Sequence, residues 1–435
     1  MGARETALNA LIACRKDGAW SNGVLKQYCT RDGLDKREAA LASRLCYGVL
    51  QNRGKLDFYL KQLLTGRLKD LHPALRDILH LGLYQIYEMD KIPASAAVNE
   101  AVALAKKYCR KQRNAHGLVN GVLRSAVRTK GSLQEPTTLC DRYSHPQKLI
   151  NLLESYVGLE RLESMLAANN AVPPTVVQVN TQKTNAQELS QALKAEGVIA
   201  QMHPWLPDCL VLSGTGNLEQ LRTFREGLFY VQDAAAKLSV LCAALPAGAK
   251  VLDCCAAPGG KSFAASMAGA GQIISCDVHP HKLTLMGNGA QRLGLTQITP
   301  CLQDATVFVP EWGRTMDVVL ADVPCSGYGI IRKKPDIRYK DPDSMNDLPD
   351  LQLQILKNQA RYVAPGGVLM YSTCTLVRKE NESVVERFLK ADPDFYPEKL
   401  TLPPVFPENT TGMLTLVPGE YDTDGFFICC LRRKR

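Results

Sequence analysis

Hydrophobic positions recur with a helical period through the first 130 residues. Two groups of apolar residues have the spacing of a single helix face: Leu8, Leu11 and Ile12 form one group, and Leu41, Leu45 and Val49 form the other. Runs of β-branched residues, which would indicate strands, are few. This pattern predicts an all-helical domain over residues 1–140. Residues 131–150, which overlap the end of this domain, are polar and contain Pro136 and the pair His145-Pro146. This composition is typical of a linker.

From Val172 onward the pattern changes to short strands and helices. The order is strand, helix, strand, strand, helix, at residues 176–180, 186–197, 198–202, 209–213 and 218–227. A β-α-β-β-α-β unit of the ferredoxin-like or RNA-recognition kind fits this order. We therefore expect a small α+β domain over residues 141–230, with the linker at its start. Its central strands lack the aromatic pair that stacks on bases, so the expected role is packing or shape.

Residues 231–435 alternate between apolar, strand-like runs and helix-like segments. Five of the apolar runs end in a polar or reactive side chain, and these are Asp253, Asp277, Asp304, Asp322 with Cys325, and Cys374. In an open α/β sheet, ligands bind outside the carboxyl ends of the strands, so these side chains should converge on one cleft. The predicted fold class is therefore multi-domain: all-α, then α+β, then an α/β Rossmann-like domain.

A glycine-rich turn, AAPGGK at 256–261, follows the first of these strands. Strand, turn and helix in this order bring a ligand close to the backbone N–H groups at a helix N-terminus, and glycine permits the close approach. Asp277 lies 24 residues after Asp253, near the spacing at which an acidic residue binds a nucleotide ribose. Taken alone, this sequence is more often an ordinary tight turn than a ligand site, and it gains weight only from the segments that follow it.

Composition and charge favour a globular protein with a polyanionic partner. Apolar residues make up 46% of the 435 positions, and the net charge is +9. No apolar run of 18 residues occurs and the N-terminus lacks the pattern of a secretory signal, so we expect a cytoplasmic protein. The 15 cysteines include no C-x-x-C pair, which argues against a disulfide framework and a zinc site. We expect no metal.

Eight Lys and Arg residues lie between positions 106 and 130 without one acidic residue. Lys106, Arg110 and Arg113 have the i, i+4, i+7 spacing of one helix face, and Lys111 lies beside them. Most charge runs are solvated helix faces. Because this run is long and free of acids, we favour contact with RNA phosphates.

A second cationic stretch, residues 332–345, is not expected to be helical. Its position after the fourth strand of the α/β domain predicts an active-site loop. The cations that could contact RNA phosphates there are Arg332, Lys333, Lys334 and Arg338.

Three segments resemble the Sun (Fmu-type) family of RNA cytosine-5 methyltransferases. They are DCCAAPGGKS at 253–262, DVVLADVPCSG at 317–327 and YSTCT at 371–375, of which the paired PCSG and STCT motifs are the most diagnostic. Ahead of them, residues 94–128, and above all GLVNGVLR at 117–124, resemble the RNA-binding NusB family. The resemblance covers essentially the whole chain. It implies S-adenosylmethionine as cofactor and 16S rRNA, naked or in an early assembly intermediate, as partner; we expect a monomer.

The resemblance also implies roles for individual residues. Cys374 would attack the cytosine ring, and Cys325 would assist release of the enzyme. Asp322 would hydrogen-bond the N3/N4 edge of the base, with Lys261 close to the substrate. Backbone of the glycine-rich turn would hold the methionine part of the cofactor, Asp277 its ribose and Asp304 its adenine amino group. The full set expected at the cofactor is Cys255, Ala256, Ala257, Pro258, Gly259, Gly260, Lys261, Asp277, Asp304 and Asp322.

Other classes of protein share parts of this pattern. A dehydrogenase would normally carry G-x-G-x-x-G, which APGGK is not. A DNA cytosine methyltransferase would attack through the fourth-strand cysteine, Cys325, and would not need Cys374. A non-enzymatic RNA-binding factor would not need intact Cys325, Cys374 and Asp322. Taken singly, each cysteine could be buried and inert, and each aspartate a strand-end or helix-cap carboxylate.

Overall fold

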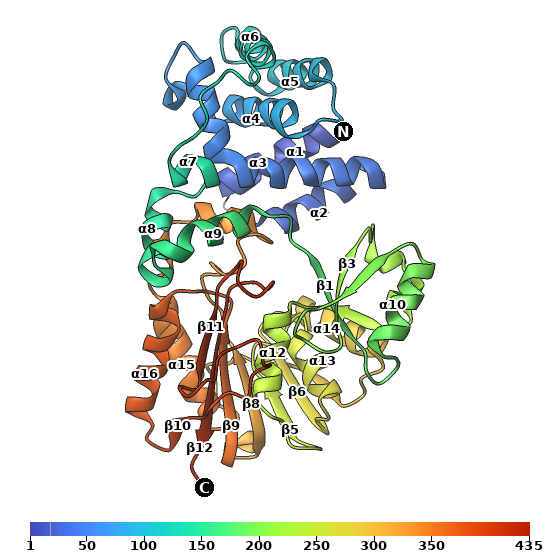
Figure 1. Ribbon diagram of the computed structural model, residues 1–435, viewed down its shortest axis with the longest axis vertical. Helices are drawn as coiled ribbons and strands as arrows, with labels where there is room; N and C mark the ends of the chain where they lie inside the picture. Colours follow the sequence, from blue (N-terminus) through green and yellow to red (C-terminus); the bar gives the residue numbers. More distant parts are fainter. Residues whose placement is uncertain (18) are drawn as a thin grey trace. The chain divides into compact units, whose positions relative to one another are not determined.

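The computed structural model describes residues 1–17 and 19–435, which form two compact units (Figure 1). The helical unit comprises Met1–Ala171 together with Ile331–Pro342, and the α/β unit comprises Val172–Ile330 and Asp343–Arg435. Within the described residues, no helix combines the length and apolarity needed to cross a membrane.

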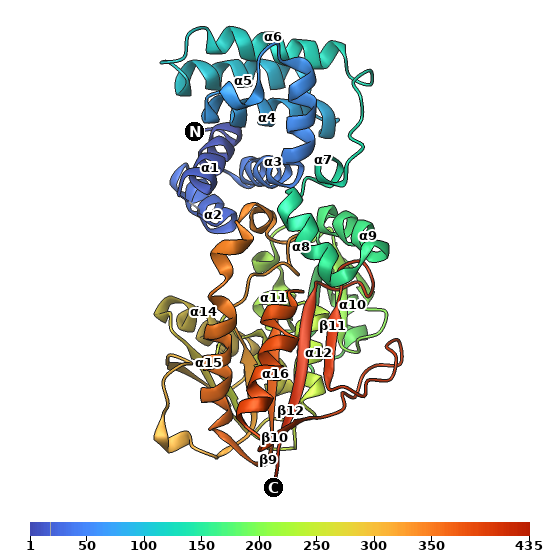
Figure 2. The same ribbon diagram turned by 90° about the vertical axis from the view of Figure 1, so that its left-hand side faces the viewer.

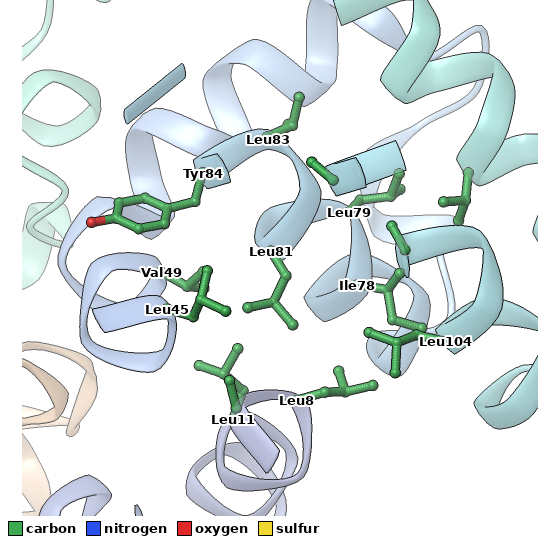
Figure 3. Packing of buried hydrophobic residues seen from close by; sticks show 14 of the residues in the cluster. Leu8, Leu11, Leu45, Val49, Ile78, Leu79, Leu81, Leu83, Tyr84 and Leu104 are labelled. Carbon is green, nitrogen blue, oxygen red and sulfur yellow. The ribbon is translucent and has the colours of Figure 1, made fainter. Parts of the chain in front are cut away.

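The predicted helical domain is confirmed. Its helices are α1 (Ala3–Asp17), α2 (Ser21–Arg31), α3 (Lys36–Leu63), α4 (Pro73–Glu88), α5 (Ala94–Tyr108) and α6 (Ala115–Arg128), with a short 3-10 turn η1 (Leu68–Asp70). Their apolar faces form one core, and Figure 3 shows Leu11 of α1, Leu45 of α3 and Leu81 of α4 around a common centre. Helix α3 begins at Lys36 because the preceding Asp35 side chain accepts a hydrogen bond from the third amide of the helix.

The linker expected at 131–150 is only partly present. Helices α7 (Leu139–Tyr143), α8 (Gln147–Val157) and α9 (Leu159–Asn170) follow α6 and belong to the helical unit. On α8 the buried side chains are Leu149, Ile150, Leu153 and Val157, a spacing that places them on one helix face. The polar residues and prolines of 131–146 obscure this pattern, because they fall just before the apolar stripe begins.

The cations at 106–113 do not share one helix face, which corrects the expectation from their spacing. Helix α5 ends at Tyr108, and Asn114 adopts a left-handed conformation before α6 begins. Arg110, Lys111 and Arg113 therefore lie in the turn between two helices, while Lys106 lies in the last turn of α5; all four are exposed. Their clustering in space is thus set by the turn.

The cationic stretch after the fourth strand is built into the helical unit. Arg338 is fully buried there, at 0% exposure, which contradicts its expected contact with RNA phosphates. Its guanidinium donates to the carbonyl oxygens of Gln51 (3.0 Å), Tyr143 (3.3 Å) and Asn169 (3.3 Å) and to Asn170 Oδ1 (2.8 Å). Its acceptors are thus neutral oxygens of α3 and of the α7 and α9 segments.

The other three cations of this stretch also lie in the helical unit. Arg332 is buried, and Lys333 and Lys334 are half-buried. Lys334 Nζ lies 5.5 Å from the ring centre of Trp20, a cation–π distance. The backbone there forms two 3-10 turns, η4 (Pro335–Tyr339) and η5 (Pro342–Met345), which agrees with the expected absence of a regular helix.

We expect Arg338→Ala to destabilise the helical unit by about 3 kcal/mol, because it leaves several buried carbonyl groups without a donor. Hydrogen exchange of the full chain measures this as faster exchange of the α3 amides around Gln51. The matched control is Lys61→Ala, which removes an exposed cation from the last turn of α3. Equal exchange in the two variants would show that the buried guanidinium contributes nothing.

The predicted ferredoxin-like unit is confirmed at the start of the α/β unit. Its antiparallel sheet has the order β2-β3-β1-β4. The elements are β1 (Thr175–Val179), α10 (Ala186–Ala195), β2 (Ile199–Met202), β3 (Cys209–Ser213), η2 (Leu218–Gln220), α11 (Arg222–Arg225) and β4 (Phe229–Val231). The single helix expected at 218–227 is broken into η2 and the one-turn α11, with an extended Leu221 between them.

A second sheet with the order β10-β12-β9-β8-β5-β6-β7 forms the rest of the α/β unit, with β11 paired to β12. Strands β5 to β9 run parallel, and β12 runs antiparallel to β9. The strands are β5 (Lys250–Asp253), β6 (Gln272–Asp277), β7 (Ile298–Leu302), β8 (Met316–Asp322), β9 (Val363–Thr373), β10 (Phe395–Pro397), β11 (Met413–Leu416) and β12 (Phe426–Arg433). The expected closing hairpin of β11 and β12 is confirmed.

Helices cover both faces of this sheet, as Figures 1 and 2 show. They are α12 (Ala234–Cys242), α13 (Gly260–Met267) and α14 (Pro280–Leu293) on one face, and α15 (Leu348–Ala360) and α16 (Glu382–Ala391) on the other; short turns η3 (Pro310–Trp312) and η6 (Arg378–Glu380) complete the elements. A hydrophobic core lies on each face of the sheet, and neighbouring residues of β5 contribute to both. Val251 clusters with Phe263 of α13, and Leu252 clusters with Leu356 of α15. The parallel strands therefore all end at one edge, where the predicted site residues lie.

Candidate active site

The turn after β5 approaches its neighbours closely at its glycines. Gly259 has φ +108°, and a Cβ there would lie 2.6 Å from the ring of Phe263 and 2.9 Å from Met286. A Cβ on Gly260 would lie 2.9 Å from the side-chain amide of Gln232. The sequence needs glycine at both positions, and the turn leads directly into α13.

The side chain of Asp253, the last residue of β5, stabilises the glycine-rich turn. It is completely buried, and one carboxylate oxygen accepts a hydrogen bond from Ser262 Oγ at 2.8 Å. Ser262 Oγ lies 2.7 Å from Ser275 Oγ on β6. Burial raises the pKa of Asp253 to about 7. This carboxylate therefore ties β5, α13 and β6 together, the structural role that strand-end acids often have.

Asp277 and Asp304 follow the next two strands at the same edge. Asp277 accepts from the His279 amide at 2.9 Å and has Lys282 Nζ 3.8 Å away. Asp304 is exposed and accepts from the amide and hydroxyl of Thr306, at 2.8 and 2.7 Å. These hydrogen bonds from Thr306 hold the pKa of Asp304 below its ordinary value. Local donors thus fix both carboxylates at the strand ends.

Lys261 and Asp322 form an ion pair at the centre of this edge. Lys261 Nζ lies 2.6 Å from Asp322 Oδ2, and Ser372 Oγ donates to Asp322 Oδ1 at 2.8 Å. The Lys261 ammonium also lies 4.9 Å from the ring centre of Phe426. Residues from α13, β8, β9 and β12 therefore fix one carboxylate and one ammonium at the ends of two neighbouring strands.

The two cysteines predicted from the fourth and fifth strands lie together. Cys325 Sγ and Cys374 Sγ are 3.3 Å apart, and both are free thiols. The hydrogen bond with Cys374 and burial raise the pKa of Cys325 well above its ordinary value. These two effects favour the uncharged thiol form of Cys325.

A set of short contacts fixes the loops that carry these thiols. Ser326 Oγ and Thr375 Oγ1 are 2.7 Å apart, and the Gly329 amide donates to the Cys374 carbonyl at 2.9 Å. A Cβ on Gly329 would lie 2.0 Å from the carbonyl oxygen of Gly425, so only glycine fits. These supporting residues were not expected from the sequence, although the serine after Cys325 and the threonine after Cys374 could have indicated them.

The predicted site residues divide between the two units. Lys261, Asp322, Cys325 and Cys374 lie together in the α/β unit, where strand spacing alone puts Asp277 roughly 10 Å from Asp322. The candidate RNA-binding cations lie in the helical unit instead: Lys106, Arg110, Lys111, Arg113, Arg332, Lys333 and Lys334. From β9 to β7 the polar groups extend over roughly 20 Å along the carboxyl edge.

Comparison with known families agrees with this architecture. A model of the 16S rRNA methyltransferase RsmB/F family matches residues 241–432. The NusB family matches residues 1–128, and the RsmF/B-like ferredoxin-like domain matches residues 145–219. The three-part fold expected from the sequence is therefore confirmed.

Individual relatives cover the whole chain. The probable ribosomal RNA small subunit methyltransferase B of Bacillus subtilis is 36% identical over 99% of this chain and 98% of its own length. The ribosomal RNA small subunit methyltransferase B of Vibrio cholerae is 35% identical over 92% of this chain and 90% of its own length. The crystal structure of PH0851 shares the fold with a TM-score of 0.81 at 24% identity, over 99% of this chain and 98% of that one. The chain therefore belongs to the RsmB/F family of 16S rRNA methyltransferases.

Proposed function

We propose that this protein methylates C5 of a cytosine in 16S rRNA, using S-adenosylmethionine and a covalent bond between Cys374 and C6. The observation that carries the proposal is the pair of free thiols 3.3 Å apart, next to the Lys261–Asp322 ion pair. Methyl transfer to an amine or a hydroxyl needs no second thiol. A covalent mechanism at cytosine C5 uses both thiols, one for attack and one for release.

The residues at the glycine-rich turn fit an S-adenosylmethionine site. At Gly259 and Gly260 the backbone packs closely against Phe263, Met286 and Gln232, and the buried Gln232 Oε1 beside Gly260 has no hydrogen-bond partner among the described residues, which leaves an acceptor for a bound ligand. The carboxylates of Asp277 and Asp304 lie farther along the same edge, where they would bind the ribose and the adenine amino group. When bound, the cofactor supplies an electrophilic methyl group.

Attack by the Cys374 thiolate begins the proposed reaction. C5 of cytosine is a poor nucleophile, and formation of the S–C6 bond interrupts the aromatic ring and makes C5 enamine-like. The electron pair displaced by this attack moves to N3, which takes up a proton from the Lys261–Asp322 pair and returns it once C5 has been methylated. Asp322 is fixed for this transfer by Lys261 and by Ser372. C5 would then take the methyl group as the sulfonium–methyl bond of S-adenosylmethionine breaks, which leaves a neutral thioether.

Release reverses the covalent step. A proton leaves C5, its electron pair restores the C5–C6 double bond, and the C6–S bond breaks toward Cys374. Cys325 lies 3.3 Å from that sulfur and, as a thiol, can give it a proton. The transfers are concerted: the Cys325 sulfur takes up the proton from C5 as it gives its own proton to the departing Cys374 sulfur, so that protons and electrons balance over the step.

Transfer of label from methyl-labelled S-adenosylmethionine to a small-subunit rRNA transcript tests the proposal. Nucleoside analysis of the product should find the label in 5-methylcytidine. Label in a base-nitrogen or ribose methyl group would contradict the C5 chemistry. Label in a matched DNA strand would favour the DNA-type mechanism instead.

Asp277→Ala should weaken S-adenosylmethionine binding by about 1–3 kcal/mol, because the ribose hydroxyl groups lose their acceptor. Asp277→Asn should lose less, since its amide oxygen can still accept from the His279 amide. Titration calorimetry measures both, with Asp350→Ala at an exposed position of α15 as the control. Unchanged affinity in Asp277→Ala would remove this residue from the cofactor site.

Neutralising Arg110, Lys111 and Arg113 together should weaken RNA binding and reduce the slope of log K against log salt by about 2. The three side chains are exposed in the α5–α6 turn, where phosphates can reach them. The control neutralises three exposed cations elsewhere in the helical unit: Lys16, Arg37 and Lys69. An unchanged slope would identify the turn as an ordinary solvated surface, and cofactor affinity should not change in either variant.

A further inference from the structure

Glu380 is a buried acid in the α/β unit for which the proposed chemistry has no use. It ends the short turn η6, between β9 and α16, and is 3% exposed. Within the part of the chain that the structure describes, no Lys or Arg forms an ion pair with it. Burial raises its pKa above the ordinary value. Burial of a carboxyl group costs free energy, so we expect the Glu380 side chain to have a specific role.

The carboxylate of Glu380 holds the backbone around Cys325. Its Oε2 accepts from the amide of Ser326 at 2.9 Å and from Nε2 of Gln352 at 2.9 Å. The same Gln352 nitrogen donates to the carbonyl of Pro324 at 2.9 Å. Glu380 and Gln352 therefore fix the residue before Cys325 and the residue after it.

The backbone of Glu380 is in turn attached to the strand that carries the other thiol. Tyr371 Oη donates to the Glu380 carbonyl at 2.5 Å, and Tyr371 lies on β9, three residues before Cys374. The adjacent Asn381 donates to the carbonyl of Thr375 at 3.0 Å. Glu380 thus connects the loop of Cys325 with the strand end and loop of Cys374.

We propose that Glu380 is a positioning residue for Cys325, which holds this thiol against Cys374 for the release step. The role in release rests on the proposed function, whereas the placement of the Cys325 loop does not. The contact is made through a main-chain amide, so it fixes where the sulfur lies without Glu380 touching substrate.

The charge of Glu380 adds a second effect on the same thiol. The titratable groups facing Cys325 are Cys374, Glu380, Asp322 with its partner Lys261, and Tyr371. After the hydrogen bond with Cys374 and burial, the negative charges of Glu380 and Asp322 further favour the uncharged thiol of Cys325. A neutral side chain in place of Glu380 should therefore make Cys325 easier to deprotonate.

Two substitutions separate position from charge. Glu380→Asp keeps the carboxylate but withdraws it by one methylene, so the hydrogen bond to Ser326 is lost. Glu380→Gln keeps an oxygen at the right distance but removes the charge. Both are studied in the full chain by hydrogen exchange of the peptide containing Ser326 and, without RNA, by the pH profile of Cys325 alkylation with iodoacetamide.

Glu380→Asp should speed exchange of the Ser326 amide by about tenfold and should accumulate covalently bound RNA on a denaturing gel. Glu380→Gln should keep the slow exchange but alkylate at Cys325 with a midpoint at lower pH. Unchanged exchange and no trapped RNA in Glu380→Asp would overturn the positioning role. An unmoved alkylation profile in Glu380→Gln would overturn the effect of charge. If exchange and alkylation respond but no variant, Cys325→Ala included, traps RNA, then the positioning holds and the proposed chemistry fails.

Discussion

Cys374→Ala should abolish methyl transfer, by at least about 10⁴-fold, and should form no covalent complex with RNA. The physical reason is that the S–C6 bond comes first, so without it C5 stays aromatic and unreactive. Cofactor and RNA affinity should be retained, because the substitution removes one sulfur from a loop held by other contacts. The measurement is transfer of labelled methyl groups to small-subunit rRNA.

A matched thiol provides the control for this result. Cys301 lies half-exposed on β7 in the same unit, and Cys301→Ala should transfer methyl groups at the wild-type rate. Methyl transfer by Cys374→Ala within tenfold of wild type would contradict a covalent step through this residue.

Cys325→Ala should transfer one methyl group per enzyme and then stop with the RNA still attached. Attack by Cys374 does not need Cys325, but release does, since the departing sulfur loses its proton donor 3.3 Å away. The complex should survive a denaturing gel, and turnover should fall by at least about 100-fold.

Two further variants check this interpretation. The double variant Cys325→Ala with Cys374→Ala should trap nothing, because the attacking thiol is absent. A trapped complex in Cys374→Ala but not in Cys325→Ala would reverse the two roles and would match a DNA-type mechanism. The fold and the position of both thiols would be unaffected by that reversal.

Much of the α/β unit could be predicted because each parallel strand is a short apolar run that ends in a distinctive residue. Asp253 and Cys374 mark the ends of β5 and β9 in the sequence as clearly as in the structure. The hairpin of β11 and β12 was likewise visible as two apolar runs. Local patterns of this kind depend on neighbours in the sequence, which one sequence reveals.

Contacts between distant segments could not be predicted in this way. The sequence around Arg338 is charged and lacks any apolar period, so it indicated an exposed loop, yet its guanidinium is buried by carbonyl groups from residues 51, 143 and 169. Glu380 was equally hidden, because an acid at the start of a helix is common. The role of each depends on partners far away in the chain.

The site residues fall between these two cases. The motif around Cys325 and the motif around Cys374 were each visible, but only the structure brings the two sulfurs to 3.3 Å. By contrast, the spacing of Lys106, Arg110 and Arg113 indicated a single helix face, and the end of α5 at Tyr108 separates them. The i, i+4, i+7 spacing identifies one helix face only where the helix is unbroken. Here a turn of six residues separates α5 from α6, and the same spacing occurs across that turn.

Mass spectrometry of the complex trapped by Cys325→Ala tests the central claim most directly. After digestion of protein and RNA, we expect one cross-linked peptide, with the nucleotide on Cys374 and with a mass that exceeds that of the free peptide by the mass of 5-methylcytidine monophosphate. A nucleotide on any other residue would contradict Cys374 as the nucleophile. An adduct on Cys374 in which the methyl group is on a position other than C5 would contradict the proposed reaction.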